Sequence, residues 1–458
     1  MRLKVKLNRD MRKWILAALG LLLLAACGRK ATVTELEIVP EPVFMVQKDG
    51  FFTLHSTLKM SITGVGQNSP TMKCVMKMLR SAHLHPSLVP TSADSDIELV
   101  LNDTVNTELG TEGYLLEVRD DGIYLSANSE GGLLYGVQTL MQMLPPDVMR
   151  TTYASVTLPE CTILDYPRFE WRGLAVDDSA GVLGKKYLKR LLDVMSLYKL
   201  NRLQLASPCV TDTDELAELC EYASARNVLI EAVDSCGWEF ETDTVFCREG
   251  FYEGLERARE GCSVVMSPAD YCSFDRYQAD PRYQPKAEAG VVTLARTYAF
   301  EPVPDGTPVR LAESIVGGCG RYTAGKGDDA RHAEYMLLPR ALALAEALWS
   351  PAEKRDWGRF RRNAEGQKER LSAKGYGYCE GSFTPIFTAR RVDDATMNIE
   401  ITTEVPFTYI FYTTDNSTPT RESTVYIGPV NMTRGTHIKI LPVYKGDVRD
   451  SVYEFVIK

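Results

Sequence analysis

The chain has 458 residues, of which 45% are hydrophobic and 25% charged, and its formal net charge is −9. This composition excludes a disordered protein, and the length allows roughly two to four domains. Because lysine and arginine form no run after residue 13, we expect no nucleic-acid partner.

Residues 1–27 have the features of an export signal. Arg12 and Lys13 precede an apolar run from Trp14 to Ala26 that is too short to span a bilayer. The run ends in LAAC, which resembles the processing box of bacterial lipoproteins and implies that Cys27 carries a lipid; the alternative is a plain signal peptide with a chance cysteine. We therefore expect an exported lipoprotein, periplasmic or at the cell surface, that reaches the membrane only through this anchor.

The distribution of cysteine and histidine argues against a metal site. The ten other cysteines form no CxxC pair, and none of the five histidines lies between residues 86 and 331. This excludes a zinc site or a His-based triad in the middle of the chain. We expect neither a metal nor another cofactor.

Residues 28–160 alternate short strand patterns with turns and predict an α+β domain. In EGYLLEVRDDGIYLSA, Asp121-Gly122 lies between two alternating runs and indicates a hairpin. The following GGLLYGVQTLMQML has helical periodicity and is ended by Pro145.

In residues 161–378 the sequence pattern is different, because short apolar runs alternate with amphipathic helix patterns. The runs are GLAVD (173–177), NRLQLA (201–206), NVLIEAVD (227–234), DTVF (243–246), CSVVMS (262–267) and SIVGG (314–318). Such alternation predicts a parallel sheet, and the number of units favours a (β/α) barrel. Residues 379–458 have strand patterns with turn dipeptides and predict a small β-sandwich.

Several stretches, taken in order, resemble glycoside hydrolase family 20, the β-N-acetylhexosaminidases. They include YPRFEWRGLAVDDS, LLDVMSLYKLNRLQL, VVMSPADYCSFDRYQ and HAEYMLLPRALALAEALWSP. The resemblance covers nearly all of the chain after the signal. It implies a TIM-type barrel behind an α+β domain, and an activity that releases terminal N-acetylhexosamine from glycans.

The residue pair that this chemistry needs has no counterpart here. In the family a glutamic acid protonates the leaving oxygen, and an adjacent aspartate at the end of the fourth strand holds the acetamido group of the sugar. The chain's only Asp-Glu pair, Asp214-Glu215, starts a helix pattern instead, where acidic residues complement the helix dipole.

The resemblance also indicates where the missing segment was. NVLIEAVD resembles the third strand of the family's barrel, with Asp234 at its acidic position, whereas DTVF and VVMSP resemble the sixth and seventh strands. From Trp171 to Ser350 there are about 180 positions, against about 200 to 250 for an eightfold barrel. We therefore expect an incomplete or distorted barrel, which either closes with fewer strands or has its gap covered by a protein partner or a second copy.

The remaining candidate site residues follow from the same resemblance. Candidates for substrate binding are Arg172, Asp177, Asp234, Trp238 and Asp275, and weak candidates for a relocated acid are Glu239 and Glu231. Arg172 matches the arginine that grips sugar hydroxyls in the family; the alternative is a structural salt bridge to an acid such as Asp177. Trp238 matches either a histidine of the third-strand motif or a tryptophan of the fifth.

The sequence is compatible with three functions. The first, which we favour, is an exported, hexosaminidase-like lipoprotein in carbohydrate metabolism that binds N-acetylhexosamine-containing glycans without hydrolysing them. The second is an active β-N-acetylhexosaminidase with relocated acids. The third is a decaying gene product, or an interaction module whose old cleft binds protein.

Overall fold

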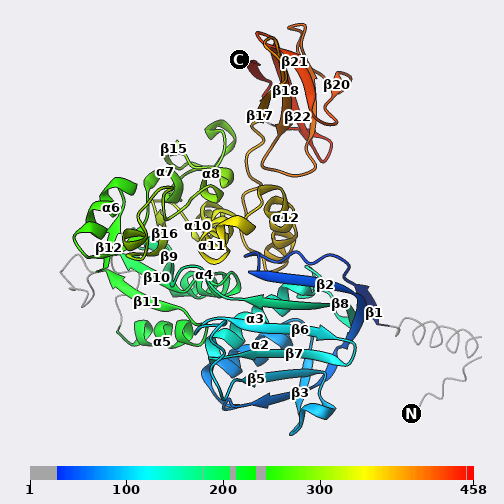
Figure 1. The fold of residues 1–458 in the computed structure, drawn as a ribbon, viewed down its shortest axis with the longest axis vertical. Helices are drawn as coiled ribbons and strands as arrows, with labels where there is room; N and C mark the ends of the chain where they lie inside the picture. The colour runs from blue at the N-terminus through cyan, green and yellow to red at the C-terminus, as the bar shows by residue number, and fades with distance from the viewer. Residues whose placement is uncertain (1–27, 179, 207–212, 234–243, 450, 458) are drawn as a thin grey trace, which may run out of the picture.

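The computed structural model describes residues 28–178, 180–206, 213–233, 244–449 and 451–457. Figure 1 shows three successive parts: an N-terminal α/β part in blue and cyan, a middle part in green and yellow, and a small all-β part in orange and red. Cys27, Asp234, Trp238 and Glu239 lie outside the described residues. Within the described residues no helix has the length and apolarity needed to cross a bilayer.

The N-terminal part is built on one eight-stranded sheet with the order β1-β8-β6-β7-β5-β3-β4, and β2 pairs with β8. Its strands are β1 (Arg29–Thr32), β2 (Phe44–His55), β3 (Thr57–Thr63), β4 (His85–Leu88), β5 (Ile97–Leu101), β6 (Tyr114–Arg119), β7 (Gly122–Ala127) and β8 (Tyr153–Asp165). Helices α2 (Pro70–Ser81) and α3 (Glu130–Met143) pack their apolar residues into a common core with this sheet. Because β8 runs to Asp165, the sheet extends past residue 160.

Local sequence explains two of these elements. β6 and β7 pair as the predicted antiparallel hairpin, but Arg119 lies opposite Gly122, so the turn residues are Asp120 and Asp121 and Gly122 begins β7. Helix α3 begins where the Ser129 side chain accepts a hydrogen bond from the backbone N–H of Gly132, and it ends just before Pro145.

Within the described residues, the middle part contains six parallel strands that form a single sheet. They are β9 (Trp171–Asp177), β10 (Arg202–Ala206), β11 (Leu229–Val233), β12 (Thr244–Cys247), β13 (Ser263–Met266) and β16 (Ile315–Thr323). The connecting helices are α4 (Gly184–Leu197), α5 (Thr213–Ser224), α6 (Phe251–Arg259), α7 (Ala269–Cys272), α8 (Leu294–Tyr298), α9 (Val309–Ala312), α10 (Ala330–Leu337), α11 (Arg340–Trp349) and α12 (Trp357–Ala373). A short pair, β14 (Arg276–Tyr277) and β15 (Glu288–Val291), lies beside them.

The strand order is that of an interrupted barrel. It runs β11-β10-β9-β16-β13-β12, so the last strand, β16, pairs with the first, β9, as it does where a barrel closes. β11 and β12 form the two ends of the sheet and do not pair with each other in the described part of the chain. This confirms the predicted incomplete (β/α) barrel.

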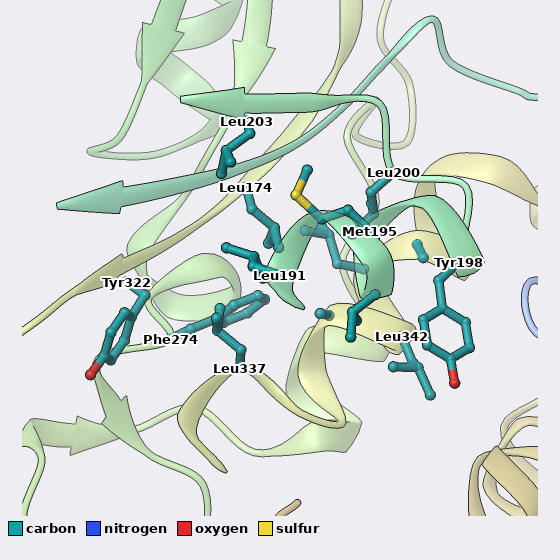
Figure 2. Close-up of a cluster of buried hydrophobic side chains, with 14 of the residues drawn as sticks. Leu174, Leu191, Met195, Tyr198, Leu200, Leu203, Phe274, Tyr322, Leu337 and Leu342 are labelled. Carbon is teal, nitrogen blue, oxygen red and sulfur yellow. The ribbon is translucent and has the colours of Figure 1, made fainter. Parts of the chain in front are cut away.

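One face of the sheet is packed against helices. Leu174 and Val176 of β9 and Leu203 of β10 are buried in a common core with residues of α4, α10 and α11. Figure 2 shows Leu174 and Leu203 directed towards Leu191 and Met195 of α4. Since side chains alternate along a strand, the residues between them point to the opposite face.

A buried ion pair joins the N-terminal sheet to the barrel. Lys199, in the turn after α4, has its Nζ 2.8 Å from Oδ2 of Asp165, and neither side chain is exposed. Tyr114 donates to the same oxygen at 2.6 Å, and the indole N–H of Trp349 donates to Oδ1 at 2.8 Å. Because all four residues are fully buried, this network fixes β9 and β10 against the N-terminal sheet.

The C-terminal part is a β-sandwich, as predicted. One antiparallel sheet has the order β17-β18-β21, and the other has the order β20-β19-β22-β23 with β24 also on β22. The strands are β17 (Ile386–Arg391), β18 (Thr396–Thr402), β19 (Tyr409–Thr413), β20 (Thr424–Val425), β21 (Val430–Thr433), β22 (His437–Tyr444), β23 (Asp447–Val448) and β24 (Tyr453–Val456). Ile399, Ile410 and Ile440 form the centre of its core.

Candidate functional site

The face of the barrel sheet away from the helices carries the polar candidates. We call it the inner face; its members include Trp171, Gly173, Ala175 and Asp177 of β9, Arg202 and Gln204 of β10, Glu231 of β11, Phe246 of β12, Val265 of β13, and Cys319 and Arg321 of β16. The register places Glu231, Gln204, Ala175 and Arg321 in one row across four neighbouring strands. A row of this kind is one layer of a barrel interior.

Glu231 is held inside this row. The amide nitrogen of Gln204 donates to Oε2 of Glu231 at 3.4 Å, and Nε of Arg202 lies 3.8 Å from Oε1. Burial raises the pKa of Glu231, although Gln204 and Arg202 oppose the shift. The side chain is only 13% exposed, so Glu231 is the described inner-face acid whose environment favours the protonated form.

Aromatic rings fill the neighbouring layer of the interior. Trp171 and Phe246 meet edge to face with their ring centroids 5.3 Å apart, and the guanidinium of Arg202 lies 5.2 Å from the Trp171 ring. Gly173 makes room for the indole, because a Cβ at that position would lie 2.9 Å from Nε1 of Trp171. The buried Nε1 has no hydrogen-bond partner within the described residues.

The β16 side of the inner face is cationic. Nη2 of Arg321 donates to the Ser273 hydroxyl at 3.4 Å, and its buried Nε has no acceptor among the described residues. Burial and the charge of Arg248 lower the pKa of Arg321. Asp275 lies close by: burial raises the pKa of its carboxyl, and the charge of Arg321 opposes that shift. This side therefore combines the cation of Arg321 with the half-buried acid Asp275.

Arg172 is not part of the inner face. It lies on the helix-covered side with Leu174 and Val176, and its side chain is 0% exposed. Nη1 and Nη2 donate to the two carboxylate oxygens of Glu112 at 3.0 and 2.8 Å, while Nε donates to the carbonyl of Lys199. The remaining N–H groups point to protein oxygens as well. Arg172 thus has the geometry of an ion pair between domains, and its partner is Glu112 rather than Asp177.

The charge of Glu112 depends on that pair. Burial by itself would raise the pKa of Glu112, but the charge and hydrogen bonds of Arg172, together with Asn201, outweigh burial and hold it below its ordinary value. Glu112 therefore stays ionised and keeps the guanidinium of Arg172 oriented away from the inner face.

Asp177 lies at the carboxyl end of β9, where its main-chain oxygen accepts a hydrogen bond from Ala324 at 2.8 Å. In barrels of this type the carboxyl ends of the strands form the functional edge. Of the predicted residues within the described ranges, Asp177, Glu231 and Asp275 therefore lie at or near one edge, and Arg172 does not.

Four inner-face residues were missed as site candidates: Trp171, Arg202, Gln204 and Arg321. A signal existed for two of them, because in NRLQLA the polar Arg202 and Gln204 alternate with Leu203 and Leu205. No group of three or more His, Cys, Asp or Glu side chains in the described part of the chain is arranged to hold a metal ion.

Comparisons with known proteins agree with this geometry. The model of glycosyl hydrolase family 20, domain 2, matches residues 35–166, and the model of its catalytic domain matches residues 169–214 and 247–352. An Fn3-associated domain matches residues 399–456. The break in the catalytic-domain match runs from α5 through β11 into β12, so it includes the interruption of the sheet.

The chain is 35% identical over 436 residues to a β-hexosaminidase of Akkermansia muciniphila, covering 59% of this chain and 86% of that relative. It is 21% identical over 594 residues to a β-hexosaminidase of Porphyromonas gingivalis, covering 93% and 76%. The fold matches the N-acetyl-β-hexosaminidase of Streptomyces plicatus with a TM-score of 0.64 at 19% identity, over 76% of this chain and 97% of that one. The chain belongs to glycoside hydrolase family 20.

Proposed function

We propose that this chain is an exported lipoprotein that binds N-acetylhexosamine-bearing glycans at the inner face and does not hydrolyse them. The proposal starts from the family membership, since the relatives are β-hexosaminidases and a solved homologue from Vibrio harveyi is in complex with N-acetylglucosamine. It departs from the family's activity because the sequence between β11 and β12 contains no counterpart of the family's fourth strand with its Asp-Glu pair.

One observation carries the departure from catalysis. The catalytic-domain match stops at residue 214 and resumes at 247, and the alignment with the Porphyromonas relative extends over 594 residues, more than the 458 of this chain. The relative thus has residues for which this chain has no counterpart. In the family, the adjacent Asp and Glu stand on the fourth strand, between the strands that β11 and β12 resemble.

The described inner face supports binding better than acid catalysis. Retaining glycosidases place two acidic groups across the scissile bond, about 5 to 5.5 Å apart, or use one acid with the substrate's own acetamido group. In the described part of the inner face, Glu231 is the acid that lies among polar neighbours: Gln204 donates a hydrogen bond to its carboxylate, and Arg202 lies beside it. The inner face combines the indole of Trp171 with the amide of Gln204 and the guanidinium groups of Arg202 and Arg321, and aromatic rings with a few placed polar groups are typical of small-molecule sites.

A second function has one observation in its favour. The raised pKa of Glu231 is the property that a general acid needs. A hexosaminidase acting through Glu231 would still need a second group, such as Asp177 or Asp275, to hold the acetamido group.

Calorimetry and a chromogenic assay on the mature chain separate these functions. We expect saturable binding of N-acetylglucosamine oligomers and no release of aryl alcohol from an aryl N-acetyl-β-glucosaminide. Gln204→Leu should abolish the binding, whereas Gln47→Leu, on the exposed side of β2, should leave it unchanged. Turnover that disappears in Glu231→Gln would establish the enzyme instead, and the absence of both binding and turnover would refute the glycan site.

The lipid anchor is a separate part of the proposal. It is supported by the LAAC sequence and by the short distance along the chain from Cys27 to β1 at Arg29. Mass spectrometry of the N-terminal peptide should detect an acylated Cys27, and Cys27→Ser should release the protein from membranes. An unmodified mature N-terminus would contradict the anchor without affecting the glycan site.

A further inference from the structure

We propose that a cavity between the N-terminal domain and the barrel binds an amphiphilic anion, a ligand with an apolar body and a carboxylate or phosphate head. The cavity has a volume of about 450 Å³ and is lined by residues of α2, α3, α4 and α12. It shares no residue with the inner face, and it falls in the size range of small-molecule sites. These helices meet where the N-terminal and middle parts adjoin in Figure 1.

The apolar part of the lining is rich in methionine. Met78 comes from α2, Met141 from α3 and Leu197 from α4, and Met149 follows α3. Methionine side chains are flexible and polarisable, so they adapt to an apolar body without demanding one shape. This wall suits an alkyl or aryl group better than a sugar.

Two of the charged groups in the lining are already neutralised. Nε of Arg190 lies 2.7 Å from a carboxylate oxygen of Glu334, and Nε of Arg226 lies 2.6 Å from Oδ1 of Asp193. These two pairs contribute no net charge to the cavity.

Three further cations in the lining have no such partner. Lys77, Lys374 and Arg370 make no ion pair with a carboxylate of the described residues, although the charge of Asp193 reaches Lys374. Burial lowers the pKa of Arg370 to about 10, so this buried cation is costly where it stands, whereas Lys77 and Lys374 are exposed. An anion in the cavity would remove that cost.

Arg370 also has an unused donor in the wall. Its Nη1 and Nη2 donate to the carbonyls of Met141, Gln142 and Leu144 at the end of α3, at 2.7 to 2.9 Å. Its Nε is buried and has no acceptor among the described residues, while the residue as a whole is 3% exposed. Such a group is normally satisfied, so the guanidinium stands in the wall as a positive charge without a carboxylate partner, which favours an oxyanion head in the cavity.

Calorimetry on the mature chain with decanoate and decyl phosphate tests the site, and 1-decanol serves as the neutral control. We expect saturable binding of at least one anion, at least about tenfold tighter than decanol, and a rise in the unfolding temperature with ligand concentration. Decanoate and decyl phosphate distinguish a carboxylate from a phosphate head.

Variants locate the binding. Lys374→Met and Lys77→Met should each weaken the anion about tenfold, and Ala373→Trp should fill the cavity and abolish binding. Lys354→Met, an exposed lysine outside the cavity, should have no effect. The proposal is wrong if neither anion saturates, if decanol binds as tightly, or if Ala373→Trp binds like the unaltered chain.

Discussion

Replacing Arg172 tests whether this residue holds the two domains together or contacts sugar. Its side chain is fully buried and that of Glu112 is 18% exposed, so Arg172→Met would leave a largely buried carboxylate without its cation. Breaking a buried ion pair from one side costs about 3 to 5 kcal/mol. Such a loss corresponds to a fall of roughly 10 °C in the unfolding midpoint of a domain of this size.

Thermal unfolding followed by circular dichroism measures the effect, with Arg119→Met as the matched control. Arg119 pairs with Glu117 on the surface and is 49% exposed, so its loss should change stability by less than about 0.5 kcal/mol. The double variant Arg172→Met/Glu112→Gln should recover part of the loss, because no unpaired charge remains. An unchanged midpoint in Arg172→Met together with lost glycan binding would refute the structural role.

Three further predictions concern buried groups. Burial raises the pKa of Glu346 from 4.5 to about 7, so the folded state binds this proton more tightly than the unfolded state, and the free energy of unfolding should fall as the pH rises from 4.5 to about 7. Glu346→Gln should remove about 3 kcal/mol of this pH dependence, measured by melting at pH 5 and pH 8. Gly317→Ala would place a Cβ 1.8 Å from the Trp171 carbonyl, so we expect lost inner-face binding and a lower melting temperature; an unaltered variant would contradict the β16–β9 register. Lys199→Met should destabilise by about 3 kcal/mol because Asp165 loses its cation, and a melt unchanged by it would contradict the buried network.

The fold was predictable because its strands differ from their surroundings in composition. The runs GLAVD, NRLQLA and CSVVMS are short, apolar and separated by amphipathic helices, and they are found as β9, β10 and β13. The order of these runs, compared with the family, also located the interruption between NVLIEAVD and DTVF. Both signals can be recognised in short stretches of sequence, so they require no knowledge of tertiary contacts.

The candidate site was harder to predict, because it depends on which way each side chain points. Arg172 has the same parity along its strand as Leu174 and Val176, which face the helices, so alternation already favoured a buried position. Its partner Glu112 lies 60 residues earlier in another domain, and no local pattern connects the two. Arg321 could not be assigned either, since its place beside Ser273 depends on strand pairing.

The rate at which the mature chain cleaves an aryl N-acetyl-β-glucosaminide, compared with an active family member under the same conditions, tests the central claim most directly. We predict no turnover above the uncatalysed rate, together with saturable binding of N-acetylglucosamine oligomers. Turnover that is lost in Glu231→Gln, or in Glu239→Gln, would contradict the account, because a working acid would then exist despite the interrupted barrel.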